Sequence, residues 1–195
     1  MAWGALGLQL LLSIETAISE GETIRQGVIT YLGYFTILTN VAGALTLSVP
    51  AWAPGSVLGT FFRRSGPVTA ITASLLLVGI TYFFLLRDVW EPKGLHQLSA
   101  VMLHYVTPPL LLSYWWLFIP KQQLHWSDIL PWSLYPIGYL IYILIRGRIL
   151  QDYPYPFMDV STLGYGQVLL NAVGLLLGFT ALALLLIAVG RSLPR

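Results

Sequence analysis

Residues Gly164–Gly190, with the sequence GYGQVLLNAVGLLLGFTALALLLIAVG, contain no charged side chain and decide the class of fold. An α-helix needs about 20 apolar residues to cross about 30 Å of hydrocarbon, and this stretch is longer than that. Five more apolar stretches, of 18 to 22 residues, are close to that required length. The six expected spans are Ala2–Ser19, Val28–Val49, Pro67–Arg87, Leu98–Ile119, Ile129–Arg146 and Gly164–Gly190. The sequence therefore predicts an all-α polytopic membrane protein, a single bundle of six transmembrane helices.

The composition supports this class. Of the 195 residues, 56% are hydrophobic and 9% are charged, whereas roughly a quarter are charged in ordinary soluble domains. The formal net charge of +2 forms no cationic field, so a nucleic-acid partner is not expected. The chain has no cysteine, which excludes disulfides, thiolate metal sites and a cysteine nucleophile. The connections between the spans are too short for a second domain, so residues 1–195 are expected to form one domain.

Six spans place both termini on one side of the membrane, and the loops after the first, third and fifth spans on the other. Lys and Arg divide evenly between the two sides, so the positive-inside rule leaves the orientation open. The acidic residues do not divide evenly, because only Asp128 falls on the side of the termini. The other seven acids are Glu15, Glu20, Glu22, Asp88, Glu91, Asp152 and Asp159. This acidic side is also the one from which the second, fourth and sixth spans begin.

Polar side chains recur inside these three spans. Thr36 and Asn40 lie on one face of the second span, His104 lies in the fourth and Asn171 in the sixth. At about 1.5 Å per residue, Thr36, His104 and Asn171 come to roughly the same depth, about 9–12 Å below the acidic side. Polar groups within a span usually face the bundle interior, so these side chains are expected to line one cavity. Two alternatives stay open, namely hydrogen bonds between helices for each Asn and a structurally satisfied core histidine for His104.

A hydroxyl beside an imidazole is the smallest nucleophile–base pair, which makes Thr36 and His104 the candidate catalytic residues. Asn40, Asn171 and Tyr142 are candidates to stabilise an oxyanion or to orient the pair. The tyrosine stripe that includes Tyr142 also fits core contacts and an interface anchor. No metal site is expected, because His104 has no second ligand within reach, and no carboxylate that would orient His104 is evident.

Charged residues on the acidic side are expected to frame the mouth of this cavity. The candidates for the cavity or its mouth are Glu15, Arg87, Asp88 and Asp159. The segment Tyr153–Phe157, with its two prolines and three aromatic residues, is expected to form either a stiff lid or part of an aromatic belt.

Three short motifs resemble a known family. Tyr34-Phe35-Thr36-Ile37-Leu38-Thr39-Asn40 is similar to a segment in the second span of the androgen-induced family of six-pass membrane proteins. Leu103-His104-Tyr105-Val106-Thr107-Pro108-Pro109-Leu110 resembles its His-x-x-x-Pro segment, and Tyr155-Pro156-Phe157-Met158-Asp159 resembles its third landmark. The resemblance implies a membrane threonine hydrolase of lipid esters, notably fatty-acid esters of hydroxy fatty acids, with Thr36 as nucleophile and His104 as its histidine. The compact length looks more like that of bacterial six-pass relatives.

The function expected from the sequence is therefore hydrolysis of a lipid ester within the membrane, without a cofactor. The expected partner is a membrane lipid or acyl-chain substrate, the expected location is the bacterial inner membrane, and the oligomeric state is left open. A lipid or small-molecule transporter or binding protein without chemistry is the main alternative. It is weakened because the inverted repeats and paired broken helices typical of transporters are not apparent. A scaffold whose polar stripes serve only helix contacts is the third possibility.

Overall fold

The computed structural model describes residues 1–192, and within that range the chain is helical with no β-strand. The α-helices are α1 (Ala2–Ser19), α2 (Ile24–Gly33), α3 (Phe35–Trp52), α4 (Val57–Phe61), α5 (Ser65–Thr81), α6 (Leu95–Val101), α7 (Thr107–Phe118), α8 (Ile129–Leu150) and α9 (Val160–Ser192). The π-helical segments are η1 (Tyr82–Leu86) and η2 (Met102–Val106), and the 3₁₀ turns are η3 (Trp126–Asp128) and η4 (Pro156–Met158). The prediction of an all-α protein is confirmed.

Five segments are long and apolar enough to cross a membrane. These segments are Ala2–Ser19, Phe35–Trp52, Ser65–Leu86, Trp126–Leu150 and Val160–Ser192. By length and composition they mark an integral membrane protein. The first has the bounds that the sequence predicted, and α9 bends at Gly164, whose φ is 74°.

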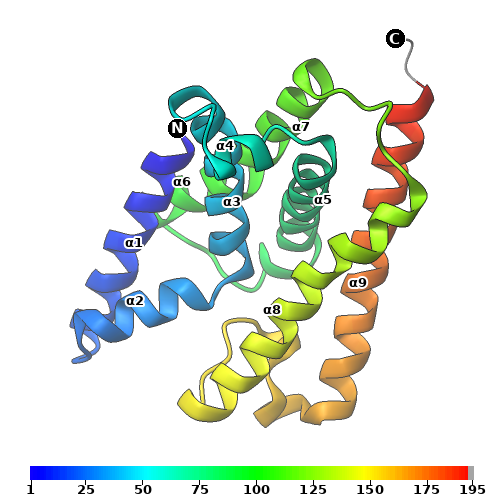
Figure 1. The fold of residues 1–195 in the computed structure, drawn as a ribbon. Coiled ribbons are helices and arrows are strands. Elements are labelled where there is room, and N and C mark those ends of the chain that lie inside the picture. The colour runs from blue at the N-terminus through cyan, green and yellow to red at the C-terminus, as the bar shows by residue number, and fades with distance from the viewer. Residues whose placement is uncertain (193–195) are drawn as a thin grey trace.

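The single helix predicted over Val28–Val49 is instead two helices, α2 and α3, which meet at Tyr34. The Tyr34 backbone is extended, with φ −85° and ψ 128°, so the helical hydrogen-bond ladder stops there. In Figure 1, α2 runs obliquely to both α1 and α3. Gly27 allows the close approach of α2 to α1, because a Cβ at this position would lie 2.7 Å from the Ile14 Cα.

The helix predicted over Leu98–Ile119 consists of three consecutive pieces, α6, η2 and α7. It is not among the five segments above, so this span, the fourth along the chain, is not confirmed. Pro108 explains the irregular middle piece, because proline has no N–H and its ring clashes with the carbonyl four residues earlier. That carbonyl belongs to His104, which lies within the π-helical turn η2. The π-helical turn therefore results from the proline pair that follows it.

The start of α1 and the end of α9 lie at the same end of the molecule, and the turn between α1 and α2 lies at the other end (Figure 1). Two clusters of buried side chains meet at Tyr34, which packs against both. One joins α1, α2, α3 and η2 and includes Ile37 and Leu103, and the other joins α8, α9 and the segment between them and includes Tyr139 and Tyr155. Thr36 lies between the two clusters, since Ile37 packs into the first and Phe35 packs against the second.

Candidate functional site

Thr36 is the second residue of α3, immediately after the helix break at Tyr34. The first N–H groups of a helix have no acceptor within the helix, so the Thr36 N–H is available to a group from another part of the chain. The same break leaves the last carbonyls of α2 without helical donors. The local backbone therefore needs partners from elsewhere in the fold.

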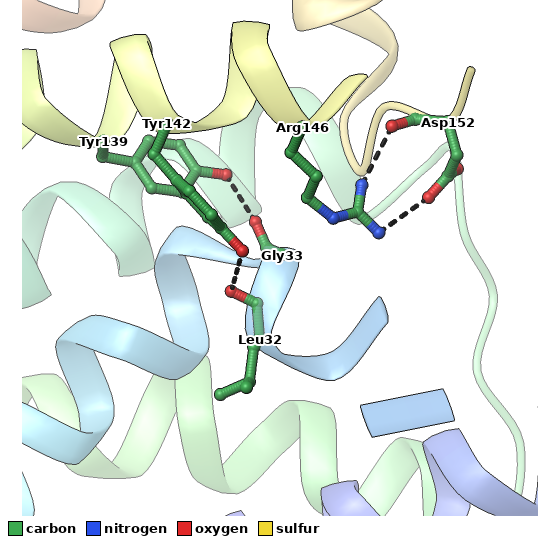
Figure 2. A network of polar contacts seen from close by, with 6 residues as sticks. All are labelled: Leu32, Gly33, Tyr139, Tyr142, Arg146 and Asp152. Carbon is green, nitrogen blue, oxygen red and sulfur yellow. Dashed lines mark hydrogen bonds and ion pairs between the residues drawn. The ribbon is translucent and has the colours of Figure 1, made fainter. Parts of the chain in front are cut away.

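Helix α8 supplies partners for the carbonyls, as Figure 2 shows. The Tyr139 hydroxyl donates to the Gly33 carbonyl at 2.8 Å, and the Tyr142 hydroxyl donates to the Leu32 carbonyl at 3.3 Å. Arg146 is buried and pairs with Asp152 through the carboxylate and the backbone carbonyl, each at 2.9 Å. Its guanidinium lies against Gly33, where a Cβ would come within 3.0 Å of the guanidinium carbon. Tyr139, Tyr142 and Arg146 of α8 thus hold the end of α2, and this contact determines where α3 begins.

The imidazole of His104 is held on three sides. Its Nδ1 lies 2.8 Å from the Ala100 carbonyl, and its ring stacks on that of Tyr82 with 3.9 Å between the centroids. On the backbone side, α5 approaches closely at Gly79, where a Cβ would lie 2.9 Å from the His104 carbonyl oxygen. Both π-helical segments contribute, because His104 belongs to η2 and Tyr82 begins η1. Such π-turns occur frequently at functional sites.

The structure brings Thr36 and His104 together, with 3.4 Å between Thr36 Oγ1 and His104 Nε2. In a neutral imidazole one ring nitrogen donates and the other accepts. A carbonyl such as that of Ala100 can only accept, so Nδ1 carries the proton and the lone pair of Nε2 faces the Thr36 hydroxyl. The Ala100 carbonyl therefore orients His104, a role for which the sequence showed no carboxylate.

Asn40 connects the two candidate residues. Its side chain is fully buried, and Nδ2 donates to the Thr36 carbonyl at 2.8 Å and to the Leu103 carbonyl at 3.3 Å. The Leu103 carbonyl needs this donor, because the Thr107 N–H bonds to Met102 and Pro108 has no N–H. Asn40 was expected either to stabilise an oxyanion or to orient the pair. Its contacts fit orientation, because both of its N–H groups donate to backbone carbonyls.

Tyr155 is a site residue that the sequence analysis missed. Its hydroxyl lies 3.4 Å from Thr36 Oγ1 and accepts a hydrogen bond from the Thr36 N–H at 3.3 Å. The ring is buried between Tyr34, which it meets edge to face, and Phe157, on which it stacks. The available signal was the aromatic and proline-rich segment Tyr153–Phe157, interpreted only as a lid or an aromatic belt. Its tyrosine instead points into the bundle.

A cavity of about 930 Å³ is lined by Thr36, His104, Tyr155 and Tyr82. It extends to charged residues in the loops that follow α1 and η1, namely Glu20, Glu22, Glu91 and Lys93. The site therefore faces a space large enough for a lipid-sized ligand, with polar groups at its far end.

Several residues expected at this cavity lie elsewhere. Asn171 donates to the Phe157 carbonyl at 2.8 Å, so it holds the segment before α9 and does not line the cavity. Tyr142 binds the Leu32 carbonyl and also lies outside the lining. The expected convergence of Asn171 with Thr36 is wrong because similar depth along two helices does not make the side chains face each other.

The residues expected at the cavity or its mouth do not line it either. Glu15 is exposed on α1, and Arg87 pairs with its neighbour Asp88 at 3.3 Å. Asp159 accepts hydrogen bonds from the backbone and hydroxyl of Ser161 at the start of α9. These hydrogen bonds hold the pKa of the Asp159 carboxyl below its usual range. Local partners, which charge counting does not reveal, account for Arg87, Asp88 and Asp159, whereas Glu15 is exposed away from the lining.

A second cavity, of about 380 Å³, lies between α5, α8, α9 and the segment that carries Tyr155. Its walls are almost wholly apolar and include Phe35, Leu77 and Tyr139. Tyr155 lines both cavities and so separates the Thr36 site from this apolar space.

Within residues 1–192, no group of three or more His, Cys, Asp or Glu side chains is arranged to hold a metal ion. In comparisons with protein-family models, with curated proteins and with solved structures, no match to the chain was found. The geometry around Thr36 is therefore the basis on which a function can be inferred.

Proposed function

We propose that this protein is an integral membrane hydrolase of lipid esters, with Thr36 as the nucleophile and His104 as the general base. The observation that carries the proposal is the distance of 3.4 Å between Thr36 Oγ1 and the acceptor nitrogen of His104. Nucleophile and base are often this loosely spaced when no substrate is bound. The resemblance of the three motifs to the androgen-induced six-pass family points to the same two residues.

The reaction proceeds in two halves. Thr36 Oγ1 attacks the ester carbonyl carbon while its proton moves to His104 Nε2, and the carbonyl electron pair moves onto oxygen. When the carbonyl re-forms, the alcohol leaves with the proton from Nε2, and the acyl group remains on Thr36. Water then gives a proton to His104 and attacks the acyl carbon, after which the proton returns to Thr36 Oγ1 and a fatty acid is released. His104 gains and loses one proton in each half of the reaction and is neutral again at the end of the cycle.

The surroundings of the site favour a lipid substrate. Thr36 lies on α3, one of the long apolar helices, and the larger cavity joins the candidate pair to charged groups at one end. A fatty-acid ester matches this arrangement, because its chains are apolar and its free head group is polar.

We further propose that the chain crosses the membrane six times, with residues 95–118 as the fourth span along the chain. These residues form an unbroken succession of helical segments between the third and fifth expected spans. The first long helix begins and the last one ends at the same end of the molecule, and six crossings agree with this arrangement (Figure 1). The membrane proposed is the bacterial inner membrane.

The test uses purified protein in detergent, a hydroxyl-directed fluorophosphonate probe and a chromogenic acyl ester. Wild type and Thr36→Ser should label and turn over, whereas Thr36→Ala should fall to background, because losing the nucleophile typically costs on the order of 10³-fold or more. Thr39→Ala is the matched control, since Thr39 is equally buried on α3 but bonds to Tyr135. Equal labelling of folded Thr36→Ala and wild type would exclude the covalent mechanism.

The alternative of a transporter or lipid-binding protein without chemistry gives a different result in the same samples. In that case neither ester turnover nor labelling depends on Thr36, while flux of a lipid across proteoliposomes changes on substitution of His104. The two functions are therefore distinguished by whether a product forms.

A further inference from the structure

Two hydrogen-bond donors lie beside Thr36 Oγ1 on the side of Tyr155. One is the Thr36 N–H, which belongs to the first turn of α3 and has no acceptor within that helix. The other is the Tyr155 hydroxyl, 3.4 Å from Oγ1 and 3.3 Å from the Thr36 nitrogen. In the structure, the Tyr155 oxygen itself accepts the hydrogen bond of the Thr36 N–H.

Attack by a hydroxyl on an ester creates a negative oxygen next to the attacking atom, and preorganised donors around that oxygen usually supply the largest electrostatic stabilisation. His104 lies on the other side of Oγ1 as the proposed base, and Asn40 is fully engaged with two carbonyls. The Thr36 N–H and the Tyr155 hydroxyl are therefore the donors within reach of the developing charge.

We propose that Tyr155 is a catalytic residue, and that its hydroxyl and the Thr36 N–H together bind the oxyanion of the tetrahedral intermediate. This inference rests on the proposed hydrolase function and adds a residue to it. The substrate carbonyl oxygen takes the Thr36 N–H from the Tyr155 oxygen and in turn accepts the Tyr155 hydrogen. No proton leaves Tyr155, so the step needs no additional acid or base.

The environment of Tyr155 suits this role. The segment that carries it lies outside the long helices, and burial raises the pKa of Tyr155 to about 12, so the phenol keeps its proton at neutral pH. The two aromatic contacts of its ring, with Tyr34 and Phe157, limit how far the hydroxyl can move. Helix α3 adds a favourable field, because the N-terminus of a helix stabilises negative charge.

Tyr155→Phe removes the proposed donor and keeps the ring. The matched control is Tyr135→Phe, because the Tyr135 hydroxyl bonds to Thr39 at 2.8 Å in the same way that Tyr155 bonds to Thr36, one turn away. Each variant is titrated with a long-chain alkyl trifluoromethyl ketone, which forms a tetrahedral adduct with the nucleophile, and with the corresponding alcohol, which cannot. Affinity is measured by protection from the fluorophosphonate probe, and unfolding temperature is recorded for each protein.

For Tyr155→Phe, the affinity for the ketone should fall on the order of 10²-fold, and the affinity for the alcohol should stay unchanged. For Tyr135→Phe, the affinities for both ligands should stay unchanged. Equal losses for ketone and alcohol would mean that Tyr155 only shapes the cavity, and unchanged ketone affinity would mean that the donor is not used. Either result would overturn this inference and leave Thr36 as nucleophile. If wild type does not label, or if the ketone protects it no better than the corresponding alcohol does, the hydrolase function itself is wrong.

Discussion

Gly79→Ala tests whether the close approach of α5 to η2 positions His104. A Cβ at residue 79 would lie 2.9 Å from the His104 carbonyl oxygen and 3.6 Å from Pro108. Comfortable contacts between such atoms begin near 3.5 Å, so the two segments must separate by about 0.5 Å. The obstacle is backbone, which cannot rotate away as a flexible side chain would.

Two opposing effects decide the sign of the stability change. Replacing a helical glycine by alanine stabilises by about 0.8–1 kcal/mol when space is free. Overpacking a tight contact costs about 1–3 kcal/mol. The net expectation is a destabilisation of up to about 2 kcal/mol for Gly79→Ala. Gly174→Ala is the matched control, because nothing lies within 4 Å of a Cβ there, and it should be neutral or stabilising.

The assay compares the two variants by denaturation in detergent and by the rate of fluorophosphonate labelling. Because His104 moves with η2, its distance from Thr36 should change, and the labelling rate of Gly79→Ala should fall at least tenfold. Gly174→Ala should label at the wild-type rate. If Gly79→Ala is as stable as Gly174→Ala and labels at the wild-type rate, the α5–η2 contact is not tight and does not position the imidazole of His104.

Two further predictions concern the groups that hold the site together. Asn40→Leu should lower the free energy of unfolding by about 1–3 kcal/mol, because it leaves the Leu103 carbonyl without a donor. It should also slow fluorophosphonate labelling at least tenfold. The control Asn171→Leu should lower the unfolding temperature but label at the wild-type rate. Asp152→Ala leaves the buried guanidinium of Arg146 without its carboxylate and should destabilise by about 1–3 kcal/mol, less than for a fully buried pair because Asp152 is half exposed. Thermal unfolding at low and high salt checks this prediction, and an unchanged unfolding temperature would contradict it.

The sequence allowed the long helices to be predicted because the signal, a run of about 20 apolar residues, lies within each segment. It also allowed Thr36 and His104 to be paired, since both lie a similar distance from the same side of the membrane. Asn171 satisfied the same criterion and does not join them, because its partner is the Phe157 carbonyl. Depth is a one-dimensional quantity, and the direction in which a helix face points depends on its neighbours.

The helix break and the two π-helical turns were not predicted, although one signal was present. The pair Pro108-Pro109 removes two N–H donors from the middle of a span, so the carbonyls before it must find other partners. Tyr34 carries no comparable signal, because the break there depends on the hydroxyls of Tyr139 and Tyr142, more than 100 residues away. A contact of that kind cannot be inferred from local sequence.

Irregular backbone within a membrane protein requires partners, because the bilayer offers no water to satisfy free N–H and C=O groups. Asn40 satisfies the Leu103 carbonyl beside His104, and Tyr155 accepts from the N–H of Thr36. The first is a permanent contact between two helices, since both partners are buried. The second is different, because a substrate oxygen can replace the phenol oxygen at the same N–H. The Thr36 N–H at the start of α3 therefore has two roles. It has no acceptor within its own helix and bonds to Tyr155 in the structure, and in the proposed reaction it would bond to the oxygen that becomes negatively charged.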